Sequence, residues 1–112
     1  MYTRGRSLME KGQYQDAALC FQQSAELMPH FKTYELLGEC WLKLADYPKA
    51  LVNLAAAATL GNRQSRPLYL LAQALVGSGD KEKAIEILDK ALAVNPQYAS
   101  AKKLRENLAP GS

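Results

Sequence analysis

The chain has 112 residues, with 14 basic and 11 acidic side chains and a formal net charge of +3. This length suits one domain that can bury a core without metals or disulfides. Both signs of charge are scattered along the sequence, so we expect no nucleic-acid partner, which would require a concentrated basic face. The N-terminus does not have the form of a signal peptide, and the most apolar stretch, residues 51–60, is too short to span a bilayer. We therefore expect no membrane insertion.

Apolar residues at three- and four-residue spacing predict about seven helices along the chain. In chain order these cover Tyr2–Lys11, Tyr14–Leu27, Phe31–Leu44, Tyr47–Leu60, Ser65–Val76, Lys81–Val94 and Gln97–Leu108. The links between them have about two to five residues, and links this short join antiparallel neighbours. The sequence thus predicts helical hairpins that stack on one another.

Residues that start and stop helices support this division. Asp46 and Asp80 can accept hydrogen bonds from the first turns of the helices that follow them. Asn95-Pro96 is the clearest start signal, because it combines a capping side chain with a proline. Gly61-Asn62 and the glycines of residues 77–79 favour the left-handed backbone that ends many helices.

The same pattern returns along the chain with a period of 33 to 34 residues. Ala17 is 33 residues before Ala50, which is 34 residues before Ala84, and the same offsets relate other positions. A period in this range is typical of a solenoid built from helix pairs.

Small residues recur where stacked helices must approach closely. They are Gly5, Gly38 and Ala72 in the first helix of each pair, and Ala17, Ala50 and Ala84 in the second. A glycine inside a helix costs about 1 kcal/mol relative to alanine, so Gly38 predicts a crossing where a methyl group would collide. Large apolar residues surround these positions and include Trp41, which we interpret as a packing residue.

Two segments resemble the tetratricopeptide repeat (TPR) family. They are Tyr34-x-x-Leu37-Gly38-x-x-Trp41 and Tyr47-x-x-Ala50-x-x-x-Leu54-x-x-Ala57. The resemblance implies an all-α fold, an α-solenoid of antiparallel helix pairs in a right-handed superhelix. It divides one domain, residues 1–112, into repeats at 1–30, 31–64 and 65–96, a capping helix at 97–109 and a tail at 110–112.

The resemblance also implies a concave groove, lined by the first helix of each pair, that binds a peptide of a partner protein. Helical spacing places twelve residues on this wall: Tyr2, Arg6, Met9, Lys32, Glu35, Leu36, Glu39, Lys43, Arg66, Tyr69, Leu70 and Gln73. Such a wall suits a peptide with an apolar anchor and an acidic flank. The alternative is that the cations form a solvated face and that the apolar members pack between repeats.

Some family members clamp the terminal carboxylate of an acidic chaperone peptide with lysine, asparagine and arginine side chains. That set is poorly matched here. Arg6 and Arg66 could contribute, but Glu35 and Leu36 lie where an amide is wanted, and Glu39 would repel an acidic peptide.

The sequence gives no support to catalysis, a cofactor or a metal site. His30 stands alone after Pro29, and we interpret it as a loop residue or a contact at a helix start. Cys20 and Cys40 lack partners at metal-binding spacing, so we interpret both as packing thiols in a reducing, cytoplasmic compartment. We expect a non-enzymatic protein-interaction module, part of a larger scaffold or adaptor protein.

A competing hypothesis is a structural element that associates with copies of itself through its convex face. The run Leu54–Ala58 leaves one second helix nearly smooth where polar residues are expected. The last helix has one apolar side, which is typical of a cap, whereas the first has no such cover. We therefore expect the chain to be a segment of a longer repeat array.

Overall fold

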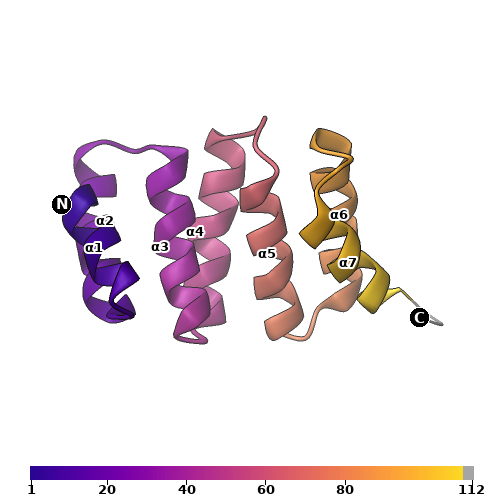
Figure 1. The fold of residues 1–112 in the computed structure, drawn as a ribbon, viewed down its shortest axis with the longest axis horizontal. Helices are drawn as coiled ribbons and strands as arrows, with labels where there is room; N and C mark the ends of the chain where they lie inside the picture. The colour runs from indigo at the N-terminus through magenta and orange to yellow at the C-terminus, as the bar shows by residue number, and fades with distance from the viewer. Residues whose placement is uncertain (110–112) are drawn as a thin grey trace.

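The computed structural model describes residues 1–109, and these form an all-α solenoid (Figure 1). The helices are α1 (Tyr2–Glu10), α2 (Tyr14–Leu27), α3 (Phe31–Lys43), α4 (Tyr47–Leu60), α5 (Arg66–Gly77), α6 (Lys81–Val94) and α7 (Ala99–Leu108). They follow one another along the longest axis of a particle measuring 44 × 26 × 21 Å. The all-α fold of stacked helix pairs is confirmed, and most helix ends fall within a residue of the predicted ones. The predicted tail, residues 110–112, lies outside the described residues.

Aspartate caps begin two of the second helices as predicted. Asp46 Oδ1 accepts a hydrogen bond from the Lys49 amide at 3.3 Å, and Asp80 Oδ1 accepts one from the Lys83 amide at 3.1 Å. Each side chain supplies an acceptor that the first turn of a helix lacks. The boundaries of α4 and α6 are therefore fixed by local chemistry.

The start predicted from Asn95-Pro96 was wrong, because α7 begins at Ala99 and not at Gln97. Asn95 Oδ1 accepts a hydrogen bond from the Gln97 amide at 3.2 Å, and the Asn95 carbonyl accepts one from the Tyr98 amide at 3.1 Å. These two bonds close a separate turn. The Asn-Pro pair thus shapes the link, and the helix starts after it.

The prediction of a left-handed stop at Gly61 was also wrong. Its φ is −106°. Left-handed φ values occur at Gly79 (92°), within the predicted stop at residues 77–79, and also at Gly12 (77°) and Ala45 (58°). Gly61 is needed for space, because a Cβ there would lie 2.6 Å from Cγ of Phe31. A close approach between two segments, and not backbone conformation, accounts for this glycine.

The small residues of the repeat lie at the helix crossings, as predicted. Ala17, Ala50, Ala72 and Ala84 have no exposed surface. A Cβ at Gly38 would lie 2.5 Å from Cδ2 of Leu54, which is itself fully buried. The spacing of α3 and α4 is therefore set by the missing side chain at Gly38.

The first helices α3 and α5 pack directly against each other, whereas neither α2 with α4 nor α4 with α6 makes a comparable contact among residues 1–109. The stack therefore curves toward the face that carries α1, α3 and α5. This concave face is where the groove was expected.

The two ends of the stack differ in polarity. α7 buries Ala101 against α6 and so covers that end of the core. At the other end, Leu36 and Leu37 of α3 are buried against the preceding helix pair, but the same repeat positions of α1 hold the exposed Thr3 and Arg4.

Candidate peptide-binding groove

Two cavities lie side by side on the α1/α3/α5 face. One of about 460 Å³ lies between α1 and α3, and one of about 320 Å³ lies between α3 and α5. Glu39, Lys43 and Arg66 line both of them. The cavities therefore form one continuous depression, which we call the groove.

The groove is lined by ten of the twelve residues placed there from the sequence. They are Arg6, Met9, Lys32, Leu36, Glu39, Lys43, Arg66, Tyr69, Leu70 and Gln73. Their common origin is helical spacing, since residues three and four apart in α3 or α5 share a face. The structure thus brings most of the predicted set together on one surface.

Tyr2 and Glu35 do not line the groove. The Tyr2 ring packs edge-on against Phe21, with 5.8 Å between centroids, and lines a separate cavity near the link between α2 and α3. Glu35 lies on the predicted face of α3 but is only 1% exposed, because neighbouring side chains cover it. Neither side chain presents a free surface to a peptide in the groove.

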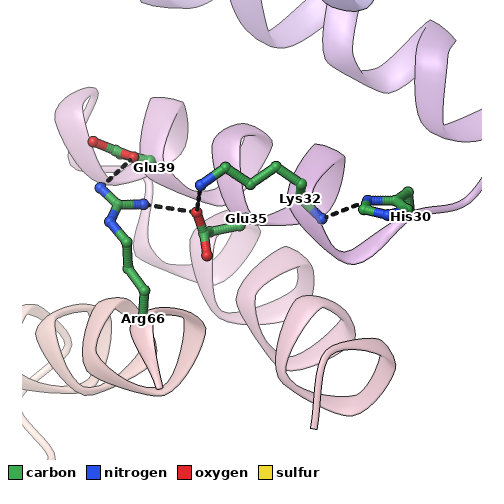
Figure 2. A network of polar contacts seen from close by, with 5 residues as sticks. All are labelled: His30, Lys32, Glu35, Glu39 and Arg66. Carbon is green, nitrogen blue, oxygen red and sulfur yellow. Dashed lines mark hydrogen bonds and ion pairs between the residues drawn. The ribbon is translucent and has the colours of Figure 1, made fainter. Parts of the chain in front are cut away.

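Glu35 is the centre of an ionic network that joins α3 to α5 (Figure 2). Its Oε2 accepts hydrogen bonds from Lys32 Nζ at 2.6 Å and from Arg66 Nη1 at 2.8 Å. Arg66 Nη2 also donates to Glu39 Oε1 at 3.0 Å. The four charges sum to zero, so the middle of the groove is neutral and its Arg66 side chain is held in place.

The pKa of Arg66 reports the same arrangement. Burial lowers this pKa, but the hydrogen bond and charge of Glu39, followed by those of Glu35, more than offset burial and raise it above its usual value. Charge-assisted bonds of this kind are shorter and stronger than neutral ones. The guanidinium is therefore fully charged, and it already donates hydrogen bonds to the carboxylates of Glu35 and Glu39.

Two other cations of the groove are less engaged. Arg6 and Lys43 are exposed, and within residues 1–109 neither forms an ion pair. Glu10 lies in the same α1/α3 cavity and offsets part of their charge. A modest positive excess thus remains at the α1 side of the groove.

The α5 side of the groove is aromatic and aliphatic. Leu70 of α5 is only 4% exposed, and Leu36 of α3, which lines the α1/α3 cavity, is 8% exposed, so both pack mainly between repeats. Tyr69 is half-buried, its hydroxyl accepts a hydrogen bond from Gln73 Nε2 at 3.1 Å, and its ring lies 5.3 Å from that of Tyr98. Tyr69 is therefore the apolar side chain of this group best placed to contact a ligand.

Sequence reasoning missed four residues that line the groove: Glu10, Tyr14, Leu42 and Tyr47. Tyr14 and Tyr47 share one repeat position at the start of a second helix, and the repeat pattern used them only as markers. Their recurrence as tyrosine was the available signal. The direction of these rings across the helix pair depends on how the pair folds.

The remaining reactive side chains serve the fold. His30 Nδ1 accepts a hydrogen bond from the Lys32 amide at 3.1 Å, which confirms its predicted place at a helix start (Figure 2). Cys20 and Cys40 are free and buried, and burial, followed by the charge of Glu39, raises the pKa of the Cys40 thiol to about 12. Among residues 1–109, no group of three metal-ligating side chains is assembled.

None of the described helices combines the length and apolar character needed to cross a membrane.

The comparisons with known proteins agree with this architecture. The sequence pattern of the tetratricopeptide repeat family matches residues 42–108, and a second pattern of the same repeat matches residues 1–31. Anaphase-promoting complex subunit 7 of Mus musculus is 33% identical over 100 residues, which are 88% of this chain but only 18% of that protein. The chain therefore spans less than a fifth of the length of this relative.

Solved structures show the same fold. The Arabidopsis OM64 TPR domain has a TM-score of 0.93 at 16% identity, covering 99% of this chain and 93% of that one. The second TPR domain of human RPAP3, solved in complex with an HSP70 peptide, has a TM-score of 0.91 at 18% identity, covering 95% of this chain and 89% of that one. These matches bear out the expected superhelical solenoid, and the pattern match over 42–108 shows that the chain belongs to the tetratricopeptide repeat family.

Proposed function

We propose that this chain is a non-enzymatic protein-interaction module that binds a peptide segment of a partner protein in the groove. The observation that carries the proposal is the continuity of the two cavities through Glu39, Lys43 and Arg66. A continuous depression across three first helices suits a peptide of several residues better than a compact small molecule. Binding by TPR domains of similar fold, such as the RPAP3 domain with its HSP70 peptide, supports the same class of ligand.

The charges of the groove favour a peptide whose acidic flank lies at its α1 side. Arg6 and Lys43 are exposed there, while Arg66 is already held by two carboxylates. An apolar side chain of the peptide would contact Tyr69 at the α5 side. Burying an aromatic or aliphatic anchor provides affinity, and the charges select the partner.

A receptor for acidic chaperone tails fits the groove less well. A terminal carboxylate near Arg66 would have to compete with Glu35 and Glu39 for the same guanidinium donors. It would also meet the negative charge of Glu39, which is 18% exposed. This arrangement discriminates against a strongly acidic ligand at the centre of the groove.

The proposal is tested by affinity capture from a lysate of the source cell, comparing wild type with the variant Arg6→Glu, Lys43→Glu, Tyr69→Ala. The control variant Lys90→Glu, Lys102→Glu makes a similar charge change at exposed sites outside the groove. We expect partners that the control retains and the groove variant loses by at least tenfold. Equal recovery by both variants would move the interaction away from the groove.

The alternative, a structural element that associates with copies of itself through its convex face, is supported by exposed apolar residues on α4. On the outer face of α4, Val52 is 70% exposed and Ala55 is exposed, whereas Ala57 is buried in the core. An apolar outer face of this kind suits an interface.

A further inference from the structure

A cavity of about 500 Å³ opens between α2 and α4, away from the groove. Leu19 and Glu26 of α2 line one wall, Lys49 and Asn53 of α4 line the other, and Tyr34 and Trp41 of α3 contribute to the floor. We call this cavity the outer cleft. It shares no lining residue with the groove.

Leu19 lines the outer cleft, and the fold does not require an aliphatic residue at its repeat position. Leu19 is 55% exposed and Val52, one repeat later, is 70% exposed, but α6 carries Glu86 at the same repeat position. A charged residue is thus compatible with this position, so packing does not explain the two aliphatic ones. Val52 is not among the residues that line the cleft, but Leu19 is, and an exposed leucine at the edge of a cavity is typical of an interaction surface.

The floor of the outer cleft is held firmly. Trp41 is half-buried and packs against two core clusters, and Lys49 Nζ lies 4.5 Å from the centroid of its ring. The nearest carboxylate to this ammonium, Asp46 Oδ2, is 3.7 Å away, and the Lys49 side chain is 59% exposed. Lys49 therefore retains capacity for a ligand at one end of the cleft.

The opposite end of the outer cleft is acidic. Glu26 lies near the C-terminus of α2, is exposed, and takes part in no ion pair among residues 1–109. Because α2 and α4 occupy the same place in successive helix pairs, they run in the same direction, with Lys49 at their N-terminal end. A helix docked antiparallel to them would bring its negative C-terminal end to Lys49 and its positive N-terminal end to Glu26.

We propose that the outer cleft is a second interaction site, which takes an amphipathic α-helix of a partner protein antiparallel to α2 and α4. A large apolar side chain of that helix inserts between Leu19 and the Trp41 ring. A helix suits this site because its backbone groups are already hydrogen-bonded, and only its apolar face must be buried. Since the cleft and the groove share no residue, one chain can hold two partners at once, as an adaptor does.

The test uses the complete chain and a phage-displayed library of single helices with randomised surface positions. We expect the selected helices to carry large apolar residues at i, i+3 or i+4, and i+7. Their affinity should fall at least tenfold for Leu19→Glu and at least threefold for Lys49→Glu, and stay unchanged for the groove variant Arg6→Glu. A nitroxide label on the C-terminus of a selected helix should broaden the NMR resonances around residue 49, and one on its N-terminus those around residue 26.

Four results would overturn the inference. The first is that selected helices bind Leu19→Glu and Leu19→Ala as tightly as they bind wild type. The second is that a label on the helix C-terminus broadens resonances around residue 26 and one on the N-terminus broadens those around residue 49. Sedimentation velocity could also show a dimer that Leu19→Glu dissociates, which would make a second copy the occupant. Failure to select any helix, while peptide binding in the groove is intact, would reject the outer cleft as a site and leave the proposed groove function untouched. Circular dichroism spectra that match wild type would show that the variants are folded.

Discussion

Replacing Gly38 with alanine tests whether close helix approach, and not chain flexibility, explains the glycine. Alanine is better than glycine inside a helix by about 1 kcal/mol, so propensity alone predicts a gain in stability. The new Cβ would lie 2.5 Å from Cδ2 of Leu54, which is fully buried and cannot move into solvent. Overpacking of a core costs roughly 1–3 kcal/mol, so we expect a net loss of about 1 kcal/mol for Gly38→Ala.

A double-mutant cycle with Leu54→Ala separates the two effects. Leu54→Ala alone should cost about 2–5 kcal/mol, because it leaves a cavity beside Gly38. In that background Gly38→Ala has no clash and should increase stability by about 1 kcal/mol, the helix-propensity gain. Urea denaturation followed by circular dichroism measures all four free energies of unfolding. The reasoning is refuted if Gly38→Ala changes stability by the same amount in both backgrounds.

Two further predictions concern buried polar groups. Glu35→Gln should lower the free energy of unfolding by about 1–3 kcal/mol, because Lys32 and Arg66 lose the charged acceptor that they share. The loss should be smaller at high salt, since the Lys32 and Arg66 side chains are 39% and 42% exposed. Equal denaturation midpoints for variant and wild type would contradict this prediction. The folded pKa of Cys40, about 12, lies above its ordinary 9.0, so the folded state holds the thiol proton more tightly. The stability that comes from this pKa difference is fully present below pH 9 and is lost as the pH rises toward 12. Denaturation measured from pH 8 to pH 11 should therefore show a free energy of unfolding that falls less steeply with pH in Cys40→Ala than in wild type. An unchanged slope would argue against it.

The helix pairs were predictable because each depends on short-range chemistry. Asp46 and Asp80 cap helices through their own side chains, and the recurring alanines lie where the period places them. Predictions failed where a residue's role depends on a distant segment. Gly61 makes room for the Phe31 ring, and Asn95 closes a turn in place of capping a helix.

The candidate site shows the same division. Helical spacing was enough to gather most residues of α3 and α5 that line the groove, all but Leu42, since residues three and four apart share a face. It could not show that Glu35 is buried beneath Lys32 and Arg66, because that contact joins residues 31 apart in sequence. The expected groove wall is consequently neutral at its centre, and within residues 1–109 its cations without an ion pair are Arg6 and Lys43.

The sequence by itself determined the repeat, the number of helices and the face of each helix, because local hydrogen bonding and hydrophobic periodicity set these. Only the tertiary structure decided which charges neutralise one another and where cavities open. Both depend on the distance between helices, which the packing of residues such as Gly38 against Leu54 sets. The outer cleft is the clearest case, since its walls come from α2 and α4 and its opening depends on the distance between these two helices.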